Sequence, residues 1–74
     1  MDTSEIERLI REAIPGASVL AQSDDGRHYT ATVVAQAFAG KSRVQQHQMV
    51  YAALKDKIGG NELHALALQT NAPE

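Results

Sequence analysis

The segment that decides the fold of this chain is Phe38-Ala39-Gly40-Lys41-Ser42-Arg43-Val44-Gln45-Gln46-His47-Gln48-Met49-Val50-Tyr51. In it a strand end turns through Gly40 into a long helix. Ser42 and Gln45 have the spacing of a capping box at the start of that helix. An apolar stripe at helical spacing follows, made of Val44, His47, Tyr51, Leu54 and Ile58. A second histidine, His64, then opens the last apolar strand in Leu63-His64-Ala65-Leu66.

The residues on either side of this segment predict the remaining elements. Ser4-Glu5-Ile6-Glu7 has the pattern of another capping box, and Pro15-Gly16 ends the helix that it begins. A strand over 17–23 leads into Asp24-Asp25-Gly26-Arg27, which favours a two-residue type I′ turn. The return strand covers 28–37. Gly59-Gly60 ends the long helix, a short strand covers 63–69, and a polar tail covers 70–74.

The element order is therefore α-β-β-α-β, which predicts one α+β domain over residues 1–74 with an ordered core at about 3–70. The hairpin makes the first two strands antiparallel. The long helix is a crossover, and such a connection normally brings the third strand back parallel to the second. We expect a three-stranded mixed sheet with both helices on one face.

Composition limits the class of protein. The chain has 74 residues, no cysteine and a formal net charge of −2. It therefore lacks disulfides and thiolate ligands of its own, and the charge disfavours a general binder of polyanions. The first helix is amphipathic and acidic at its start, and no segment has the length of a membrane span. We expect a cytoplasmic protein without a membrane segment.

The topology also predicts where the histidines lie. His28 and His64 open the second and third strands, so parallel pairing places both at one end of the sheet, on strands about 4.8 Å apart. His47 precedes the helix end by eleven residues, roughly 16 Å of rise, and cannot join them. Two imidazoles do not complete a tetrahedral metal site, although Asp24, Asp25 or Glu62 lie near in sequence. The two histidines suit a shared metal centre whose remaining ligands come from a partner protein.

Each histidine also has an ordinary structural interpretation. A histidine at a strand end is more often a half-buried polar cap than a ligand. For His47 we favour the structural interpretation: a histidine at the edge of the core with one nitrogen hydrogen-bonded. Gly40 and Tyr51 are likewise assigned structural roles, in helix entry and packing.

Catalysis and nucleic-acid binding have weaker support. No serine or threonine has a histidine and carboxylate at a plausible spacing, so we expect a protein that is not an enzyme. The element order resembles the KH class of RNA-binding modules, but their Gly-x-x-Gly loop is absent. Lys41, Arg43 and Gln46 could form a surface for a partner or a nucleic acid. The simpler interpretation of the two cations is a solvated helix entry.

Nearly the whole chain, as far as Leu68, resembles the BolA family, and its short hairpin resembles the short-loop bacterial members. The resemblance rests on Phe38 to Lys41, on Val-Gln-Gln-His-Gln-Met-Val-Tyr at 44–51, and on Leu63 to Leu66. It implies a single KH-like domain of the class II type. It also implies a heterodimer with a monothiol glutaredoxin that shares a [2Fe-2S] cluster with glutathione.

The same resemblance implies which residues bind the cluster. His64 matches the histidine ligand of the last strand. The second ligand of the family usually comes from the loop between the first two strands, and here His28, just past the turn, is the available substitute. We expect the isolated chain to bind no cluster and to be a monomer or weak homodimer. The alternative that the family offers is a DNA-binding transcriptional regulator of stress response and cell morphology, with weak DNA binding.

Overall fold

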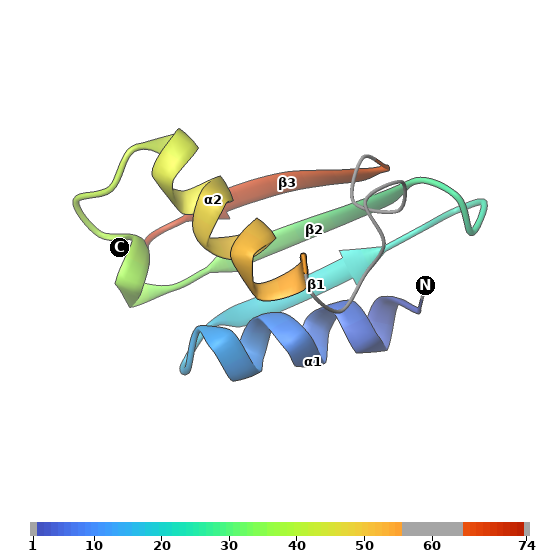
Figure 1. Cartoon of the computed structure of the whole chain (residues 1–74), viewed down its shortest axis with the longest axis horizontal. Helices are drawn as coiled ribbons and strands as arrows, with labels where there is room; N and C mark the ends of the chain where they lie inside the picture. Colours follow the sequence, from blue (N-terminus) through green and yellow to red (C-terminus); the bar gives the residue numbers. More distant parts are fainter. Residues whose placement is uncertain (1, 56–64, 74) are drawn as a thin grey trace.

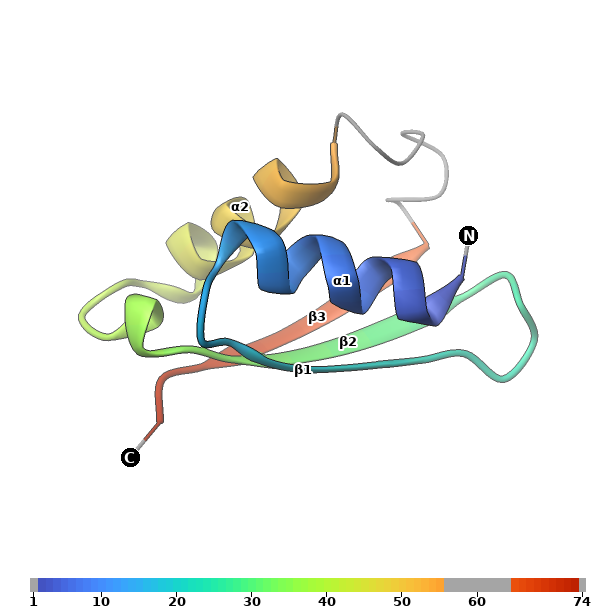
Figure 2. The same ribbon diagram turned by 90° about the horizontal axis from the view of Figure 1, so that it is seen from below.

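The computed structural model describes residues 2–55 and 65–73, and it contains two helices packed on one face of a three-stranded sheet (Figures 1 and 2). The α+β class and the α-β-β-α-β order are confirmed, with one short 3-10 helix (η1) in addition. The elements are α1 (Thr3–Ala13), β1 (Ser18–Gln22), β2 (Tyr29–Val34), η1 (Gln36–Phe38), α2 (Arg43–Leu54) and β3 (Leu66–Asn71).

The middle strand of the sheet is β2, and its two neighbours run in opposite directions. β1 pairs with it antiparallel, with Leu20 opposite Thr32. β3 pairs with it parallel, with Tyr29 opposite Leu66. The prediction of a parallel crossover after the long helix is therefore confirmed. No helix in the described part of the chain is long and apolar enough to cross a membrane.

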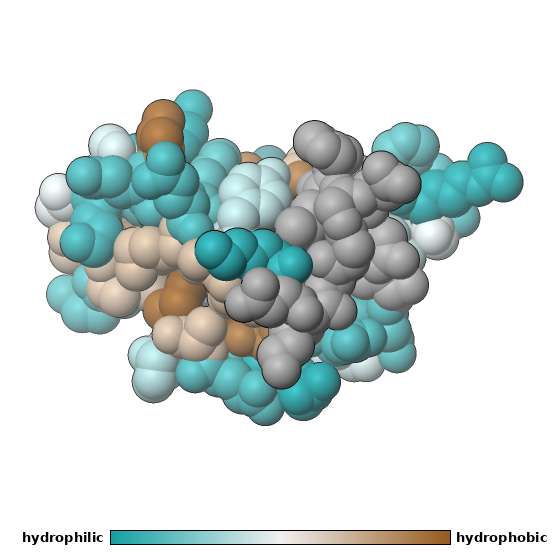
Figure 3. All heavy atoms as spheres, in the orientation of Figure 1, coloured by the Kyte–Doolittle hydropathy of each residue, from teal (hydrophilic) through white to brown (hydrophobic). Residues whose placement is uncertain are grey.

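The core lies between the sheet and the two helices. Every second residue of β2 is buried against the helices, as the two-residue period of a strand requires. The largest fully buried side chains are those of Phe38, Ile6, Ile10, Leu54, Val33 and Val50. Figure 3 shows a mostly hydrophilic surface on the described part of this face, with hydrophobic atoms gathered in a small area between α2 and α1.

The start of α1 differs from the prediction. The Asp2 side chain, not Ser4, caps the helix by accepting a hydrogen bond from the Ser4 amide at 3.3 Å. The predicted capping box is therefore wrong. Glu7 does not reach back to the first turn, because its carboxylate accepts a hydrogen bond from the Ala21 amide at 2.9 Å in β1.

The start of α2 matches the prediction, and its buried face matches it in part. Ser42 and Gln45 form the expected capping box, with distances of 2.9 and 3.2 Å. Gly40 has φ +78°, a left-handed conformation that other residues rarely adopt, so its structural role in the helix entry is supported. The predicted stripe is wrong at Val44, which is 66% exposed. The helix buries Leu54, as predicted, together with Val50, which the predicted stripe does not contain, and Ile58 lies outside the described residues.

The connection between β1 and β2 also differs. It spans residues 23–28, and no residue other than glycine has a positive φ in the described part of the chain, so the two-residue type I′ turn is wrong. β2 ends at Val34, before η1, instead of at residue 37. β3 extends to Asn71, beyond the predicted end at 69. The predicted strand opening at Leu63 and His64, and the helix stop at Gly59-Gly60, lie outside the described residues.

Candidate functional site

The loop before β2 is organised by the carboxylate of Asp25. Its Oδ1 accepts hydrogen bonds from the backbone amides of Arg27 and His28, both at 2.8 Å. Gly26 adopts φ +72°, and its amide donates to Ser23 Oγ at 2.9 Å. The hydrogen bonds to the Asp25 and Ser23 side chains, together with the positive φ of Gly26, reverse the chain direction. His28 then directly precedes the first residue of β2.

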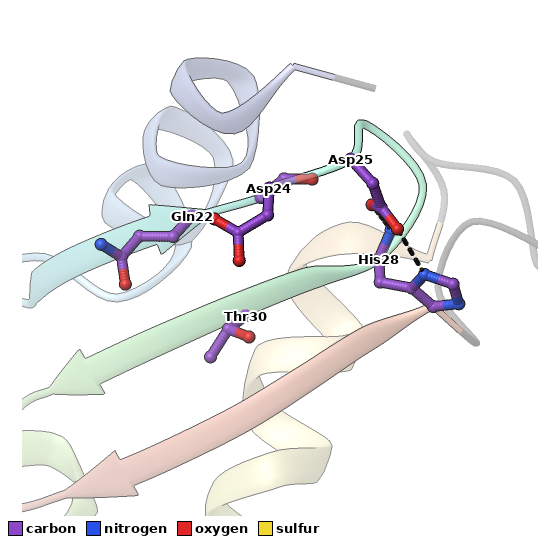
Figure 4. A pocket seen from close by; sticks show the side chains of 6 residues that line it. Gln22, Asp24, Asp25, His28 and Thr30 are labelled. Atoms are coloured by element: carbon purple, nitrogen blue, oxygen red, sulfur yellow. Dashed lines mark hydrogen bonds and ion pairs between the residues drawn. The ribbon is translucent and has the colours of Figure 1, made fainter.

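The imidazole of His28 is held by the same carboxylate. His28 Nδ1 lies 2.9 Å from Asp25 Oδ2, a contact drawn as a dashed line in Figure 4, while the His28 side chain remains 81% exposed. The hydrogen bond from the His28 ring holds the pKa of Asp25 well below its usual range, and the backbone amides of His28 and Arg27 add to this effect. Asp25 is therefore ionised at neutral pH, and the Nδ1 that faces it carries the proton.

The consequence for His28 is that Nε2 becomes its free nitrogen. A carboxylate that accepts from Nδ1–H fixes the tautomer and the ring orientation, the usual second interaction of a metal-binding histidine. The ring stands beside a hollow of about 310 Å³ on the open face of the sheet, lined by Gln22, Ser23, Asp24, Asp25, His28 and Thr30. Within residues 2–55 and 65–73, no three histidine, aspartate or glutamate side chains gather in a geometry that could hold a metal ion.

The parallel register places His28 level with the chain that enters β3. The Tyr29 amide donates to the Ala65 carbonyl at 2.8 Å, so residues 28 and 65 lie at the same end of neighbouring strands. Ala65 is the residue that follows His64 in the sequence. His64 itself lies outside the described residues, so its meeting with His28 stays a prediction.

Of the three residues predicted for a partner or nucleic-acid surface, two are exposed. Arg43 is the first residue of α2 and Lys41 lies two residues before it, and neither forms an ion pair with another described residue. Gln46 instead binds within the protein. Its amide nitrogen donates to the carbonyls of Phe38 and Lys41, at 3.2 and 3.0 Å, and its oxygen accepts from the Thr70 hydroxyl at 2.7 Å. It fastens the helix entry to β3.

Two of the residues predicted to be structural, Tyr51 and His47, lie along α2. The Tyr51 hydroxyl donates to the Leu66 carbonyl at 3.2 Å and links the helix to β3. His47 is half-buried, as expected of a histidine at the edge of the core. Its Nε2 is buried without a hydrogen-bond partner, however, so the expectation of one satisfied nitrogen is not met among the described residues.

Sequence reasoning gave Asp25 too small a role. It named this residue only as one of three carboxylates near the histidines, whereas the structure makes Asp25 the group that orients His28. The available signal was the spacing, because an aspartate side chain in a turn commonly accepts from amides two and three residues later.

A comparison with family models decides the family. The model described as "BolA-like protein" matches residues 8–74. This chain belongs to the BolA family. Among its relatives, the acid stress protein IbaG of Escherichia coli is 33% identical over 73 residues, which cover 99% of this chain and 86% of IbaG. An uncharacterised protein of Haemophilus influenzae is 34% identical over 74 residues, 100% of this chain and 86% of that protein.

Solved structures support the same assignment. A BolA homologue from Coxiella burnetii superimposes with a TM-score of 0.82 at 31% identity, over 99% of this chain and 92% of that one. The BolA architecture of two helices on a mixed three-stranded sheet is thus shared with an experimentally determined relative. The site described above lies on the loop and strand ends of this BolA fold.

Proposed function

We propose that this BolA protein is a partner of a monothiol glutaredoxin and not an enzyme. In the proposed heterodimer it shares a glutathione-dependent [2Fe-2S] cluster, for iron–sulfur trafficking or for sensing of iron and redox state. The observation that carries the proposal is the Asp25–His28 pair. It presents one exposed imidazole nitrogen at the end of the sheet where the chain enters β3.

The donor chemistry of this pair fits an iron–sulfur cluster. Imidazole is a suitable iron ligand, and in Rieske centres two histidines replace two cysteines on one iron. His28 Nε2 and His64 would be the ligands from this chain, and sulfur ligands would come from the partner, because the sequence has no cysteine. A bound cluster would supply one-electron redox chemistry. Asp25 would keep the His28 ring oriented with its Nδ1 proton in place.

The test is to mix this protein with a monothiol glutaredoxin, glutathione, iron and sulfide under anaerobic conditions. Visible absorption and circular dichroism should change from the spectrum of the glutaredoxin homodimer to that of a new species that contains both proteins. His64→Ala should abolish this change and His28→Ala should alter or weaken it. His47→Ala is the matched control and should retain it. An unchanged homodimer spectrum with the wild-type protein would refute the proposal.

A DNA-binding regulator is the second candidate. It is supported by the exposed Lys41 and Arg43 side chains at the positive end of the α2 dipole. The name of the IbaG relative adds a link to acid stress. Two cations on a chain of net charge −2 supply little attraction for phosphates, so we rank this function below the cluster-sharing one.

A further inference from the structure

The two edges of the sheet are treated differently. On the β1 edge, side chains of α1 bond to two of the outward-facing backbone groups. Glu7 accepts from the Ala21 amide at 2.9 Å, and Arg11 donates to the Val19 carbonyl at 3.3 Å. Glu7 and Arg11 also lie 3.7 Å apart as an ion pair, so one helix face supplies both a donor and an acceptor to this edge. Covering an edge in this way prevents another strand from pairing with it.

No described residue covers the backbone of the β3 edge in this way along its second half. The Tyr29 and Ala35 amides donate to the carbonyls of Ala65 and Asn71, so the odd-numbered residues of this segment bond to β2. The backbone groups of Leu66, Leu68 and Thr70 therefore face outward. Tyr51 occupies the Leu66 carbonyl. The N–H and C=O groups of Leu68 and Thr70 have no partner among the described residues.

A hollow of about 390 Å³ lies beside this open edge, lined by Arg43, His47, Leu68, Gln69, Thr70 and Asn71. Among the described residues, its lining contains a guanidinium group and no carboxylate. Arg43 is exposed and forms no ion pair with a described residue, and it stands in the first turn of α2, where the helix dipole is positive. Charge complementarity therefore selects an occupant with a carboxylate.

We propose that an extended, acidic peptide segment of a partner protein adds to β3 as a fourth strand. Its main chain would bond to Leu68 and Thr70, and an acidic side chain would meet Arg43 (Figure 1 shows α2 beside β3). Addition of a strand to an open edge is a recurring mode of peptide recognition. This site is separate from the proposed cluster site, because His28 lies at the start of β2 and Thr70 lies beside Val33 near its end.

Two other occupants fit the same edge less well. A second copy of this chain would offer its own β3, but residues 66–71 contain no acidic side chain to meet Arg43. A single-stranded nucleic acid needs aromatic side chains on which its bases stack. No phenylalanine, tyrosine or tryptophan lines the hollow. An acidic peptide can both form hydrogen bonds with the backbone groups of Leu68 and Thr70 and form an ion pair with Arg43.

The test begins with selection of random ten-residue linear peptides displayed on phage against the full chain. Enriched sequences should contain aspartate or glutamate among β-branched residues. A synthetic copy of one of them, added to ¹⁵N-labelled protein, should slow hydrogen exchange of the Leu68 and Thr70 amides. Arg43→Glu should weaken its binding about tenfold, whereas the matched charge reversal Arg8→Glu on α1 should not.

A backbone variant separates strand addition from side-chain binding. The chain is short enough for chemical synthesis, so an N-methyl group can replace the outward amide hydrogen of Leu68 without touching the pairing with β2. This change should weaken the peptide about tenfold, whereas N-methylation of Val19, on the edge covered by α1, should leave binding unchanged. Equal effects of the two N-methyl groups would refute strand addition.

Three results would overturn the proposal. The first is that no peptide is enriched, or that the enriched peptide protects amides elsewhere. The second is that the Leu68 and Thr70 amides become protected on raising the protein concentration alone, with a dimer seen by sedimentation, which would assign the edge to a second copy. The third is that a ten-nucleotide oligothymidine, and no peptide, protects them.

Discussion

His28 Nδ1 and Asp25 Oδ2 lie 2.9 Å apart in a loop whose backbone amides bond to the same carboxylate. One aspartate thus shapes the turn and sets the direction of the ring that leaves it. The two functions are linked, because a change that removes the carboxylate removes the turn contacts together with the imidazole contact.

Asp25→Ala should release the His28 ring. Without the acceptor, the preference for a proton on Nδ1 should disappear, and long-range ¹H–¹⁵N spectra of the imidazole should report a mixture of tautomers. Loss of such a second interaction typically weakens metal binding about 10- to 100-fold, and the glutaredoxin-dependent cluster should become correspondingly less stable. Asp24→Ala, one residue away, is the control. A wild-type tautomer in Asp25→Ala would contradict the assignment.

The titration of Asp25 should lie below that of an unfolded aspartate, whose pKa is about 3.9. The folded pKa is lowered, chiefly by the His28 ring, so the stabilisation that Asp25 provides is complete above the unfolded pKa. It is lost as the pH falls through the lower folded pKa. The ¹³Cγ shift of Asp25 against pH measures this. His28→Ala should move the midpoint upward, and an unmoved midpoint would assign the effect to the backbone amides alone.

His47 should respond to substitution through packing. Its Nε2 is buried and has no hydrogen-bond partner among the described residues, so His47→Ala should strand no partner of that atom. His47→Leu keeps the volume and removes an unsatisfied polar atom, and it should stabilise the fold by about 1 kcal/mol. His47→Ala should instead cost about 1–2 kcal/mol through lost packing. Thermal or urea unfolding measures both, and a destabilised His47→Leu variant would indicate a hydrogen bond to Nε2.

Gln46 should be the most sensitive polar residue of α2. Gln46→Ala removes bonds to two carbonyls and to Thr70, and should lower the free energy of unfolding by about 1–3 kcal/mol. Gln48→Ala is a matched control, because Gln48 is exposed on the same helix and should change the value by less than about 0.5 kcal/mol. Equal effects in urea titrations would show that the clamp does not stabilise the fold.

DNA affinity should be weak and strongly dependent on salt. If Lys41 and Arg43 supply the phosphate contacts, binding to a 20-base-pair duplex should fall about tenfold between 50 and 200 mM salt, without sequence preference. Replacing both residues by alanine should remove the remaining affinity. Fluorescence anisotropy measures this. Specific retention of one promoter fragment at physiological salt would instead favour the transcriptional regulator.

The parts of the fold that depend on local chemistry could be predicted from the sequence. Ser42 and Gln45 lie three residues apart and form the capping box within one helical turn. The parallel pairing of β2 and β3 followed from the helical crossover that connects them. The capping box depends on residues within one helical turn. The parallel pairing depends on a general rule for strands that a helix connects.

The errors have a tertiary cause. Glu7 had the spacing of a capping box, but an amide of β1, fourteen residues away, competes for its carboxylate. Val44 fitted a helical stripe, yet apolar residues occur on more than one face of α2, and the sheet buries Val50 instead. Periodicity could not choose between the faces. The role of Asp25 was missed for a different reason: the hydrogen bond that its carboxylate accepts from the His28 ring is local, and the three-residue spacing that permits it was not used.

The bonds from Glu7 and Arg11 to β1 limit the assemblies that this protein can form by strand pairing. Polymerisation by strand pairing needs two available edges on every subunit, one to receive a neighbour and one to pass the pattern on. A subunit in which strand pairing is hindered at one edge can pair with a neighbour only at the other edge. A strand that adds to β3 therefore does not make this subunit a link in an open-ended fibre, because α1 hinders pairing at its other edge.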